Sequence, residues 1–217
     1  MAKSTWKYTL REIIIVIIGI SIAFSMNKCA ENVKDNKLKT QYLTNLKSDV
    51  EADKIQLQKN IEAIDKKLMT CSKIIPVLNS EKDQDMQLMY NIFDIVKYEN
   101  FSPKSITYKT LINSGDLKLI ENFKLKTTIQ QHYSNYDEMA DVYVRHTSLI
   151  KDYLGNYLVN YSDYDLIPQG KGPFLDEIKL KNIVRALLTT FNDKKAATKL
   201  GIESCDILIA EIEANLN

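Results

Sequence analysis

An uninterrupted apolar stretch near the N-terminus constrains the fold more than any other part of this sequence. Between Ile13 and Met26 there is no charged residue. A helix of that length rises about 21 Å, which is less than the roughly 30 Å hydrocarbon core of a bilayer. Trp6 and Lys28 flank the stretch with side-chain types that favour the membrane interface, and a helix that includes both is long enough to span. The sequence therefore predicts a membrane-spanning helix.

The apolar residues in the middle of this stretch are the ones that we expect to contact lipid. They are Ile13, Ile14, Ile15, Val16, Ile17, Ile18, Gly19, Ile20, Ile22 and Phe24. Glu12 precedes them at the edge of the apolar zone, where a carboxylate is costly unless it stays hydrated or is paired. Its simplest role is an interfacial charge near the lipid headgroups, and a functional charge that faces a partner helix is the alternative.

Two other interpretations of the stretch have to be weighed. A cleaved signal peptide would also have a basic start, an apolar centre and a small-residue pair such as Ala23 and Ser25. However, no turn-forming residue precedes that pair, and the helical pattern continues to about Ile75. A buried helix of a small domain would show a polar side, which this stretch lacks. We favour the anchor and keep the signal peptide as the alternative.

Composition narrows the possible folds and partners of the rest of the chain. The 217 residues include only 6 glycines and 4 prolines, too few for the many turns of an all-β fold. The 29 basic and 28 acidic residues nearly cancel, which argues against a nucleic-acid partner. The cysteines Cys29, Cys71 and Cys205 form no C-x-x-C pair, so no zinc ribbon is expected. We expect three free thiols, with a Cys71–Cys205 disulfide as the alternative.

The apolar periodicity predicts an all-α protein, in which the N-terminal helix continues into an antiparallel bundle of four to five long helices. Residues 1–28 form the cytoplasmic N-terminus and anchor, and residues 29–217 form the bundle. The helices are expected at about 29–75, 85–98, 103–113, 123–164, 174–191 and 193–216, with a break at Asn192-Asp193. Ser102-Pro103 reads as a helix start, and Gly115 as a left-handed residue that ends a helix.

Two apolar seams run along the longest predicted helices, and the second has the heptad spacing typical of coiled coils and helical bundles. The first comprises Leu43, Leu46, Val50, Leu57, Ile61, Ile64 and Leu68, and Lys54 interrupts it. The second comprises Ile129, Tyr133, Tyr136, Ala140, Tyr143, Thr147, Ile150, Leu154, Tyr157, Tyr161 and Tyr164, flanked by His132, Met139, His146 and Tyr153. Such a tyrosine stripe is more often core than a surface on which ligands stack.

Residues suited to catalysis or metal binding are scarce. His132 and His146 are fourteen residues apart on one helix, about 21 Å, so they cannot bind one ion. We expect them to hydrogen-bond to tyrosine hydroxyls, with a pH-responsive role as the alternative. Asp163 and Asp165 suggest calcium, but Pro168 and Phe174 stand where the EF-hand loop needs Gly and Glu. No nucleotide-binding, hydrolase or metalloprotease motif occurs. The sequence therefore predicts no catalytic residue, no metal site and no cofactor.

Two stretches carry motifs with a family resemblance. The first matches the pattern Y-x-x-G-E-I-x-L-V-x-I-G-I-x-I-A-x-x-I-N at Tyr8, Glu12, Ile13, Val16, Gly19, Ile20, Ile22, Ala23 and Asn27. The second matches L-x-x-S-G-x-L-x-L-I-x-N-x-x-L at Leu111, Ser114, Gly115, Leu117, Leu119, Ile120, Asn122 and Leu125. Both patterns resemble those of an uncharacterised family of small single-span bacterial membrane proteins, although Arg11 replaces the family's glycine and Lys28-Cys29 its Asn-Trp. The resemblance implies an anchored helical protein with no assigned activity.

The leading hypothesis is a non-enzymatic interaction or scaffold protein of the bacterial inner membrane. Lys3, Lys7 and Arg11 favour a cytoplasmic N-terminus, which would make the bundle extracytoplasmic or periplasmic. The expected partners are the lipid bilayer and either a second copy of the chain, in a homo-oligomer, or another membrane protein. A bundle that senses an unidentified small molecule and acts through a partner is the second hypothesis. A hydrolase that uses Cys71 or Cys205 with a histidine is the third.

Overall fold

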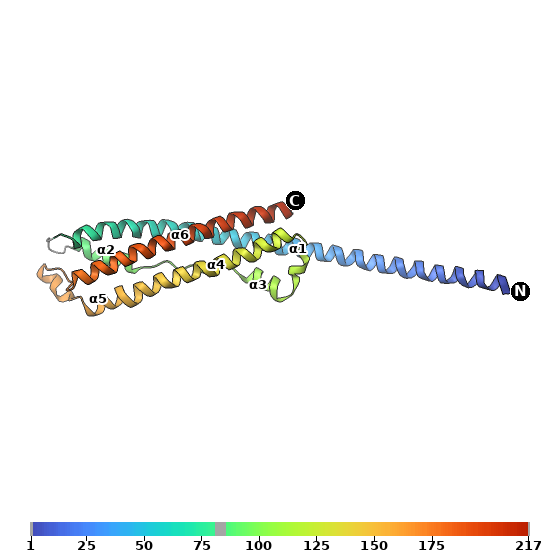
Figure 1. The fold of residues 1–217 in the computed structure, drawn as a ribbon, viewed down its shortest axis with the longest axis horizontal. Coiled ribbons are helices and arrows are strands. Elements are labelled where there is room, and N and C mark those ends of the chain that lie inside the picture. Colours follow the sequence, from blue (N-terminus) through green and yellow to red (C-terminus); the bar gives the residue numbers. More distant parts are fainter. Residues whose placement is uncertain (1, 81–85, 217) are drawn as a thin grey trace.

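The computed structural model describes residues 2–80 and 86–216, and its longest element is a single helix. α1 (Ala2–Leu78) is a helix of 77 residues without a break. Its N-terminal part stands alone, and the remainder packs in the bundle (Figure 1). From Tyr8 to Lys34 every residue is exposed. The predicted long apolar helix at the N-terminus is confirmed, and it crosses the expected boundary at residue 28 without interruption.

Four antiparallel legs build the bundle (Figure 1). After α1 come α2 (Met86–Val96), α3 (Ile106–Asn113), η1 (Asp116–Leu119), α4 (Phe123–Leu149), η2 (Ile150–Gly155), α5 (Asn156–Asn160), η3 (Tyr164–Gln169) and α6 (Glu177–Leu216). α6 packs against both α1 and α4, whereas α2 and α3 pack against α1. The described residues contain no strand apart from one isolated bridge between Ser162 and Phe174, so the all-α prediction is confirmed.

The number of long helices differs from the prediction. Three of the legs are long: α1, the α4–α5 leg and α6. The fourth leg consists of α2, an extended segment at residues 97–105 and α3. We call residues 97–105 the strap. The predicted start of the second helix, Asp85, lies outside the described residues.

Ser102-Pro103 does not start a helix, contrary to the prediction. α3 begins three residues later, at Ile106. The reason is a competing contact, since the Lys104 N–H donates to both carboxylate oxygens of Asp53 in α1, at 3.0 and 3.1 Å. That contact holds the chain extended at a position where a proline alone would permit a helix. At the other end of α3, Gly115 has φ +75° and the predicted left-handed conformation.

The predicted break at Asn192-Asp193 is absent, because α6 is one helix of 40 residues. Asn192 is exposed, and its side chain donates to the carbonyl of Leu188 one turn back at 2.9 Å, an i−4 bond that the second lone pair of a helical carbonyl can accept without breaking the helix. The helix begins at Glu177 rather than near residue 174. There the Asp176 carboxylate accepts the N–H of Lys179 at 2.9 Å, as a helix N-cap does.

The α4 leg buries several of the predicted tyrosines in the core. At two positions the residue next to the predicted one is buried, and the helix ends earlier than predicted. Met139, at 3% exposure, is buried where the prediction put Ala140, which is exposed. His146 likewise takes the buried place next to Thr147. A π-helical turn at Ile150–Gly155 follows, and the leg ends at Asn160. The predicted last seam positions, Tyr161 and Tyr164, are therefore exposed. Because residues three and four apart share a helix face, periodicity alone left the phase open.

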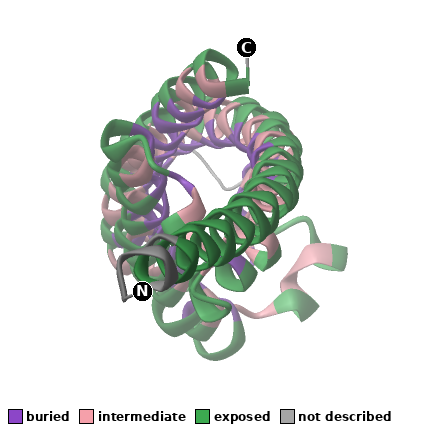
Figure 2. Ribbon diagram, turned by 90° about the vertical axis from the view of Figure 1, so that its right-hand side faces the viewer, coloured by how far each residue is buried: buried purple, intermediate pink, exposed green. Residues whose placement is uncertain are grey.

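The core divides into two apolar clusters, and the buried residues face the interior of the bundle (Figure 2). The proximal cluster, nearer the free part of α1, comprises Leu43, Leu46, Val50, Leu57, Leu111, Ile120, Leu125, Ile129, Tyr133, Tyr136, Met139, Tyr143, Cys205, Leu208 and Ile212. The distal cluster comprises Ile64, Cys71, Ile74, Leu78, Leu88, Ile92, Ile95, Ile150, Leu154, Tyr157, Leu158, Phe174, Leu180, Ile183, Val184, Leu187 and Phe191.

Gly201 of α6 packs closely against side chains of both α1 and α4, and it provides a first prediction. A Cβ there would lie 2.9 Å from Met139 Sδ and 3.3 Å from Leu57 Cδ1. Replacing Gly201 by Leu should lower the free energy of unfolding by about 1–3 kcal/mol, because the extra atoms overpack the core. Urea unfolding followed by circular dichroism measures this loss. The control is Ala196→Leu on the exposed face of the same helix, which should change stability little.

Candidate functional site

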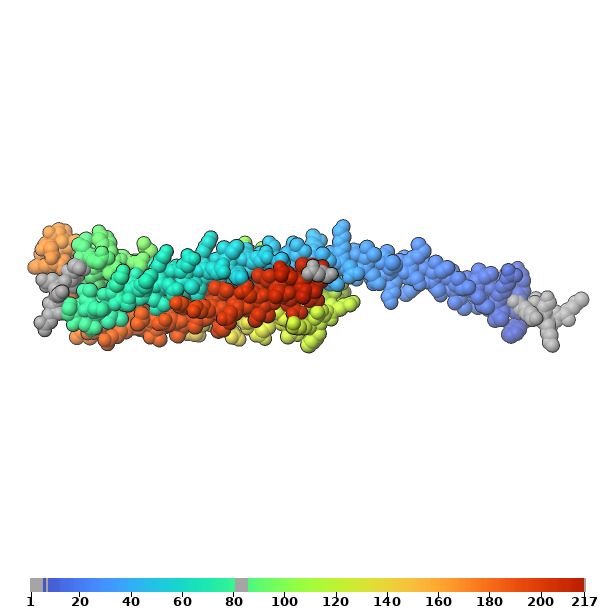
Figure 3. Space-filling view, turned by 90° about the horizontal axis from the view of Figure 1, so that it is seen from above, coloured from blue at the N-terminus to red at the C-terminus, as the bar shows by residue number. Residues whose placement is uncertain are grey.

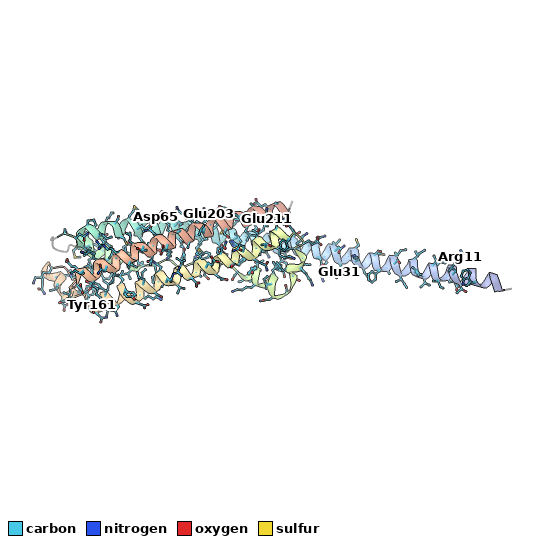
Figure 4. All side chains as sticks on the ribbon, viewed as in Figure 1. Arg11, Glu31, Asp65, Tyr161, Glu203 and Glu211 are labelled. Carbon is cyan, nitrogen blue, oxygen red and sulfur yellow. The ribbon has the colours of Figure 1, made fainter. Side chains whose placement is uncertain are left out.

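The predicted anchor residues all lie on the free part of α1. Every one of them is exposed, and none of the apolar window is buried within the described structure. By length and composition this helix could cross a membrane. Arg11 and Glu31 lie on the same free part (Figure 4), which projects from the bundle as a rod in the space-filling view (Figure 3). Glu12 is exposed as well, whereas the side chains of Lys3 and Lys7 lie outside the described residues.

A layer of polar side chains lies where the proximal and distal clusters meet. Lys194 of α6 has no exposed surface, and its Nζ donates to the main-chain carbonyl of Glu99 in the strap at 2.7 Å. The same ammonium lies 4.4 Å from the ring centre of Tyr143 in α4. The Tyr143 hydroxyl is 2.8 Å from Thr198 Oγ1, and Asn60 of α1 donates to it at 3.3 Å. All four legs therefore contribute to this polar layer.

Three polar residues spaced by seven along α1 face the second leg. Asp53 binds the strap's Lys104 N–H, as described above, and Asn60 donates to the carbonyl of Asn100 at 3.2 Å. Lys67 donates to the Asp94 carboxylate of α2 at 2.9 Å. The sequence had suggested Lys54 as the interruption of this seam. In the structure the seam position belongs to Asp53, which is 1% exposed, while Lys54 turns outward to pair with Asp206.

Burial shifts the protonation equilibria of this layer. It lowers the pKa of the Lys194 ammonium to about 8, although the Glu99 carboxylate, 3.8 Å away, opposes the shift. Burial also raises the pKa of Asp53 to about 6, against the opposing hydrogen bond from the Lys104 N–H. Both charged forms are thus disfavoured relative to water. Such buried charges contribute little net stability, and in some proteins they specify one arrangement of the chain.

The two histidines are buried, but their partners differ from the prediction. His132 Nδ1 is 2.8 Å from Ser204 Oγ, and His146 Nδ1 is 2.9 Å from Thr190 Oγ1, so both bind α6 hydroxyls rather than tyrosines. Burial lowers the pKa of His132 to about 4 and that of His146 to about 3. Both rings are therefore neutral at physiological pH, and the structure gives no support to a switch near neutrality.

The cysteines are free thiols, and the alternative of a Cys71–Cys205 disulfide is wrong. Cys71 belongs to the distal cluster and Cys205 to the proximal one. Burial raises the pKa of Cys71 to about 12 and that of Cys205 to about 11. A cysteine nucleophile reacts as the thiolate, which burial disfavours at both positions. Cys29 is exposed on the free part of α1.

The remaining candidates have structural roles. The Asp163 side chain accepts the N–H of Asp165 at 3.0 Å and so caps the short helix η3. Tyr133, Tyr136, Tyr143 and Tyr157 are buried, which confirms the core interpretation for these four tyrosines of the stripe but not for the exposed Tyr161 and Tyr164. Within residues 2–80 and 86–216, no group of three or more His, Cys, Asp or Glu side chains lies together as metal ligands would.

A surface groove of about 1030 Å³ runs between α4 and α6. Its α4 wall includes Gln131, Asn135 and Val142, and its α6 wall includes Leu200 and Ile207. One wall is therefore largely polar and the other largely apolar. The sequence analysis did not identify this groove, because it did not predict which helix lies beside α4; of the lining residues it named only His132 and Met139, as flanks of the seam.

Residues 12–150 match the model of a family of unknown function, DUF6090. The chain belongs to DUF6090. The matched range begins at Glu12 on the free part of α1, includes the strap with its partners Asp53 and Asn60, and ends at Ile150 where the π-helical turn begins. The DUF6090 match confirms the resemblance to an uncharacterised family. No curated protein and no solved structure matches the chain.

Proposed function

We propose that this protein is a single-pass protein of the bacterial inner membrane, whose extracytoplasmic bundle acts as a non-enzymatic interaction or scaffold module. One observation carries the proposal. The apolar part of α1 has no packing partner in the described structure, yet it is one continuous helix with the packed part. Its nine Ile, Val and Phe residues among the predicted anchor positions favour insertion by roughly 3–5 kcal/mol together. Lipid is the environment that would cover them.

The rest of α1 supports a role in interaction at the membrane. Between Met26 and Leu43, the first buried residue, the helix rises about 25 Å. This length would hold the bundle away from the headgroups on a stiff connection, where a neighbouring protein can reach it. Anchoring would also confine the bundle to a surface, which raises its effective concentration toward a second copy or another membrane protein. Arg11 and the other basic residues before the apolar stretch favour an extracytoplasmic bundle.

Removal of the free part of α1 tests the anchor, as our second prediction. A chain that begins at Leu38 should move completely from the membrane fraction to the soluble fraction. Its Tm should stay close to that of the full chain, because residues 8–34 are exposed and contribute nothing to the core. Carbonate extraction of membranes followed by immunoblotting measures the distribution, and circular dichroism measures the Tm.

The same experiment separates the anchor from its alternatives. If the full chain is found soluble with its N-terminus shortened to near Ser25, as intact-mass spectrometry would show, the segment is a signal peptide. A reporter fused after Asn217 determines the orientation, and cytoplasmic activity of that reporter would contradict an extracytoplasmic bundle. Crosslinking through the exposed Cys29 tests self-association in the membrane. If neither a homo-oligomer nor a partner is captured, the interaction role loses its support.

A ligand-sensing bundle is the second candidate, and the groove between α4 and α6 favours it. Its volume of about 1030 Å³ would accommodate a metabolite, with an apolar wall and hydrogen-bonding amides such as those of Gln131 and Asn135. A thermal-shift screen of metabolites, with Leu200→Glu as the groove variant, decides between the two. A stabilising ligand that the variant no longer binds would support the sensor, and the absence of any stabiliser would dismiss it.

A further inference from the structure

The strap is held to the bundle mainly through its main chain. Side chains of α1 and α6 bind its carbonyl and N–H groups, as Lys194 does at Glu99 and Asp53 does at Lys104. Its apolar attachments are two half-buried rings: Phe101, which meets Tyr136 edge-on with centroids 5.1 Å apart, and Tyr98, which packs against the distal cluster. The strap therefore depends on a few hydrogen bonds and two partly buried rings, whereas the helices depend on extensive apolar burial.

The helix positions that carry the strap-binding side chains are held by contacts outside the strap. Asn60 lies on α1 between Leu57 and Ile64, which belong to the proximal and distal clusters. Lys194 lies about one helical turn after the fully buried Phe191 on α6. Since α6 packs directly against α1 and α4, the three long helices keep their contacts whether or not the strap is in place.

Opposing effects act on the closed strap. Closure removes the Lys194 ammonium and the Asp53 carboxylate from water, which disfavours both charges. The hydrogen bonds to the strap offset that cost only while they are all formed. Opening would let water hydrate both groups, so the free-energy difference between the closed and open strap is smaller than the number of its contacts suggests.

We propose that the strap, residues 97–105, detaches from the bundle as a unit while α1, α4 and α6 remain packed. Detachment uncovers a row of main-chain-binding side chains, Asp53, Asn60 and Lys194, along the interior of the bundle. The molecule thus has a closed and an open surface on one helical framework. The strap connects α2, which adjoins the distal cluster, to α3, which adjoins the proximal one, so its state links the two ends of the bundle (Figure 1).

Lys194→Met in the full chain, extracted in detergent, tests this device. The Lys104 amide, which is bound by Asp53 and not by Lys194, should exchange with solvent about tenfold faster than in the wild type. Amides of Ile64 and Phe191 in the helices should keep their protection, and the Tm should be unchanged or higher because a buried charge is gone. Hydrogen exchange followed by mass spectrometry, on peptides that contain these residues, measures the exchange, and circular dichroism measures the Tm.

The control is Lys195→Met, the next residue on α6, whose partly exposed side chain pairs with Asp65. It should leave the exchange of Lys104 unchanged. The wild type in increasing urea gives a second test that needs no variant, since strap exchange should be nearly independent of urea while helix exchange is not. Equal urea dependence of the strap and the helices, or equal acceleration of both in Lys194→Met, would show one cooperative unit and overturn the proposal.

Discussion

Acidification from pH 7 to pH 5 is expected to lower the free energy of unfolding of the bundle by about 3 kcal/mol. The two buried histidines dominate this effect. In the unfolded chain each has a pKa of about 6.5, whereas burial lowers the folded values to about 4 for His132 and about 3 for His146. Below pH 6.5 the unfolded chain therefore binds protons that the folded chain does not bind. The free energy of unfolding falls as the pH is lowered, until the pH reaches the folded-state pKa values. By pH 5 the pair accounts for a loss of about 4 kcal/mol.

Asp53 acts in the opposite direction. Burial raises its folded pKa to about 6 from the ordinary value of 3.8, so the folded chain takes up a proton between these values before the unfolded chain does. Through Asp53, acidification to pH 5 thereby raises the free energy of unfolding by about 1 kcal/mol. Lys194 adds no slope in this range, because with a folded pKa of about 8 it is largely protonated in both states below pH 7. The histidines therefore determine the sign of the net change, and the free energy of unfolding falls on acidification.

Urea unfolding at pH 7, 6 and 5, on the chain that begins at Leu38, measures this dependence. The matched variant carries His132→Gln and His146→Gln, since glutamine can still hydrogen-bond to Ser204 and Thr190 but does not titrate. In this variant the slope should reverse, because Asp53 then dominates. A wild-type stability that is flat over this range, or a variant with the same slope as the wild type, would contradict the prediction.

Tyr157→Ala should destabilise the bundle by about 3–5 kcal/mol, among the largest effects of any single truncation in the distal cluster. The ring is 0% exposed and lies near Phe174, with centroids 6.3 Å apart. Its hydroxyl donates to the carbonyl of Asp176 at 2.9 Å and accepts the N–H of the same residue at 3.3 Å. Truncation thus leaves a cavity and also frees the residue that caps α6.

Two further variants separate these contributions. Tyr157→Phe keeps the ring and should cost about 1 kcal/mol, the usual net value of a hydrogen bond. Tyr161→Ala removes the neighbouring exposed ring, which stacks on Tyr157 from outside, and should cost less than Tyr157→Ala. Denaturant midpoints for the three variants give the comparison. A Tyr157→Ala loss below 1 kcal/mol would mean that the distal core does not depend on this ring.

Local signals account for the features of the fold that the sequence predicted correctly. The charge-free stretch after Glu12 predicts the long apolar helix, because the apolar side chains on every face can be recognised from the sequence without knowing which other parts of the chain pack nearby. Gly115 takes the predicted left-handed conformation, since the residue itself permits it. The scarcity of glycine and proline predicts helices, and this prediction does not depend on how the helices are arranged in space. Each of these inferences depends on a few consecutive residues.

The polar layer shows where such reasoning fails. Asp53, Asn60 and Lys67 recur every seven residues within an apolar seam, and this period could have revealed that they face inward together. The sequence analysis instead identified Lys54 as an interruption and did not follow the row. What the row binds could not be read in any case, because two of its partners lie in the strap, 51 and 40 residues away along the chain, and the third, Asp94, lies in α2. Lys194 belongs to a third leg and carries no local sign of burial.

The sequence by itself determined that this chain is helical, that its first helix carries an apolar segment without a polar face, and that tyrosines fill one seam. These properties follow from side-chain chemistry and spacing along a single helix. Only the tertiary structure decided which of two adjacent residues, such as Met139 or Ala140, enters the core, and that Pro103 lies in an extended strap. Both outcomes depend on which groups other legs of the bundle bring alongside, and the Asp53 carboxylate facing the Lys104 N–H is the clearest example.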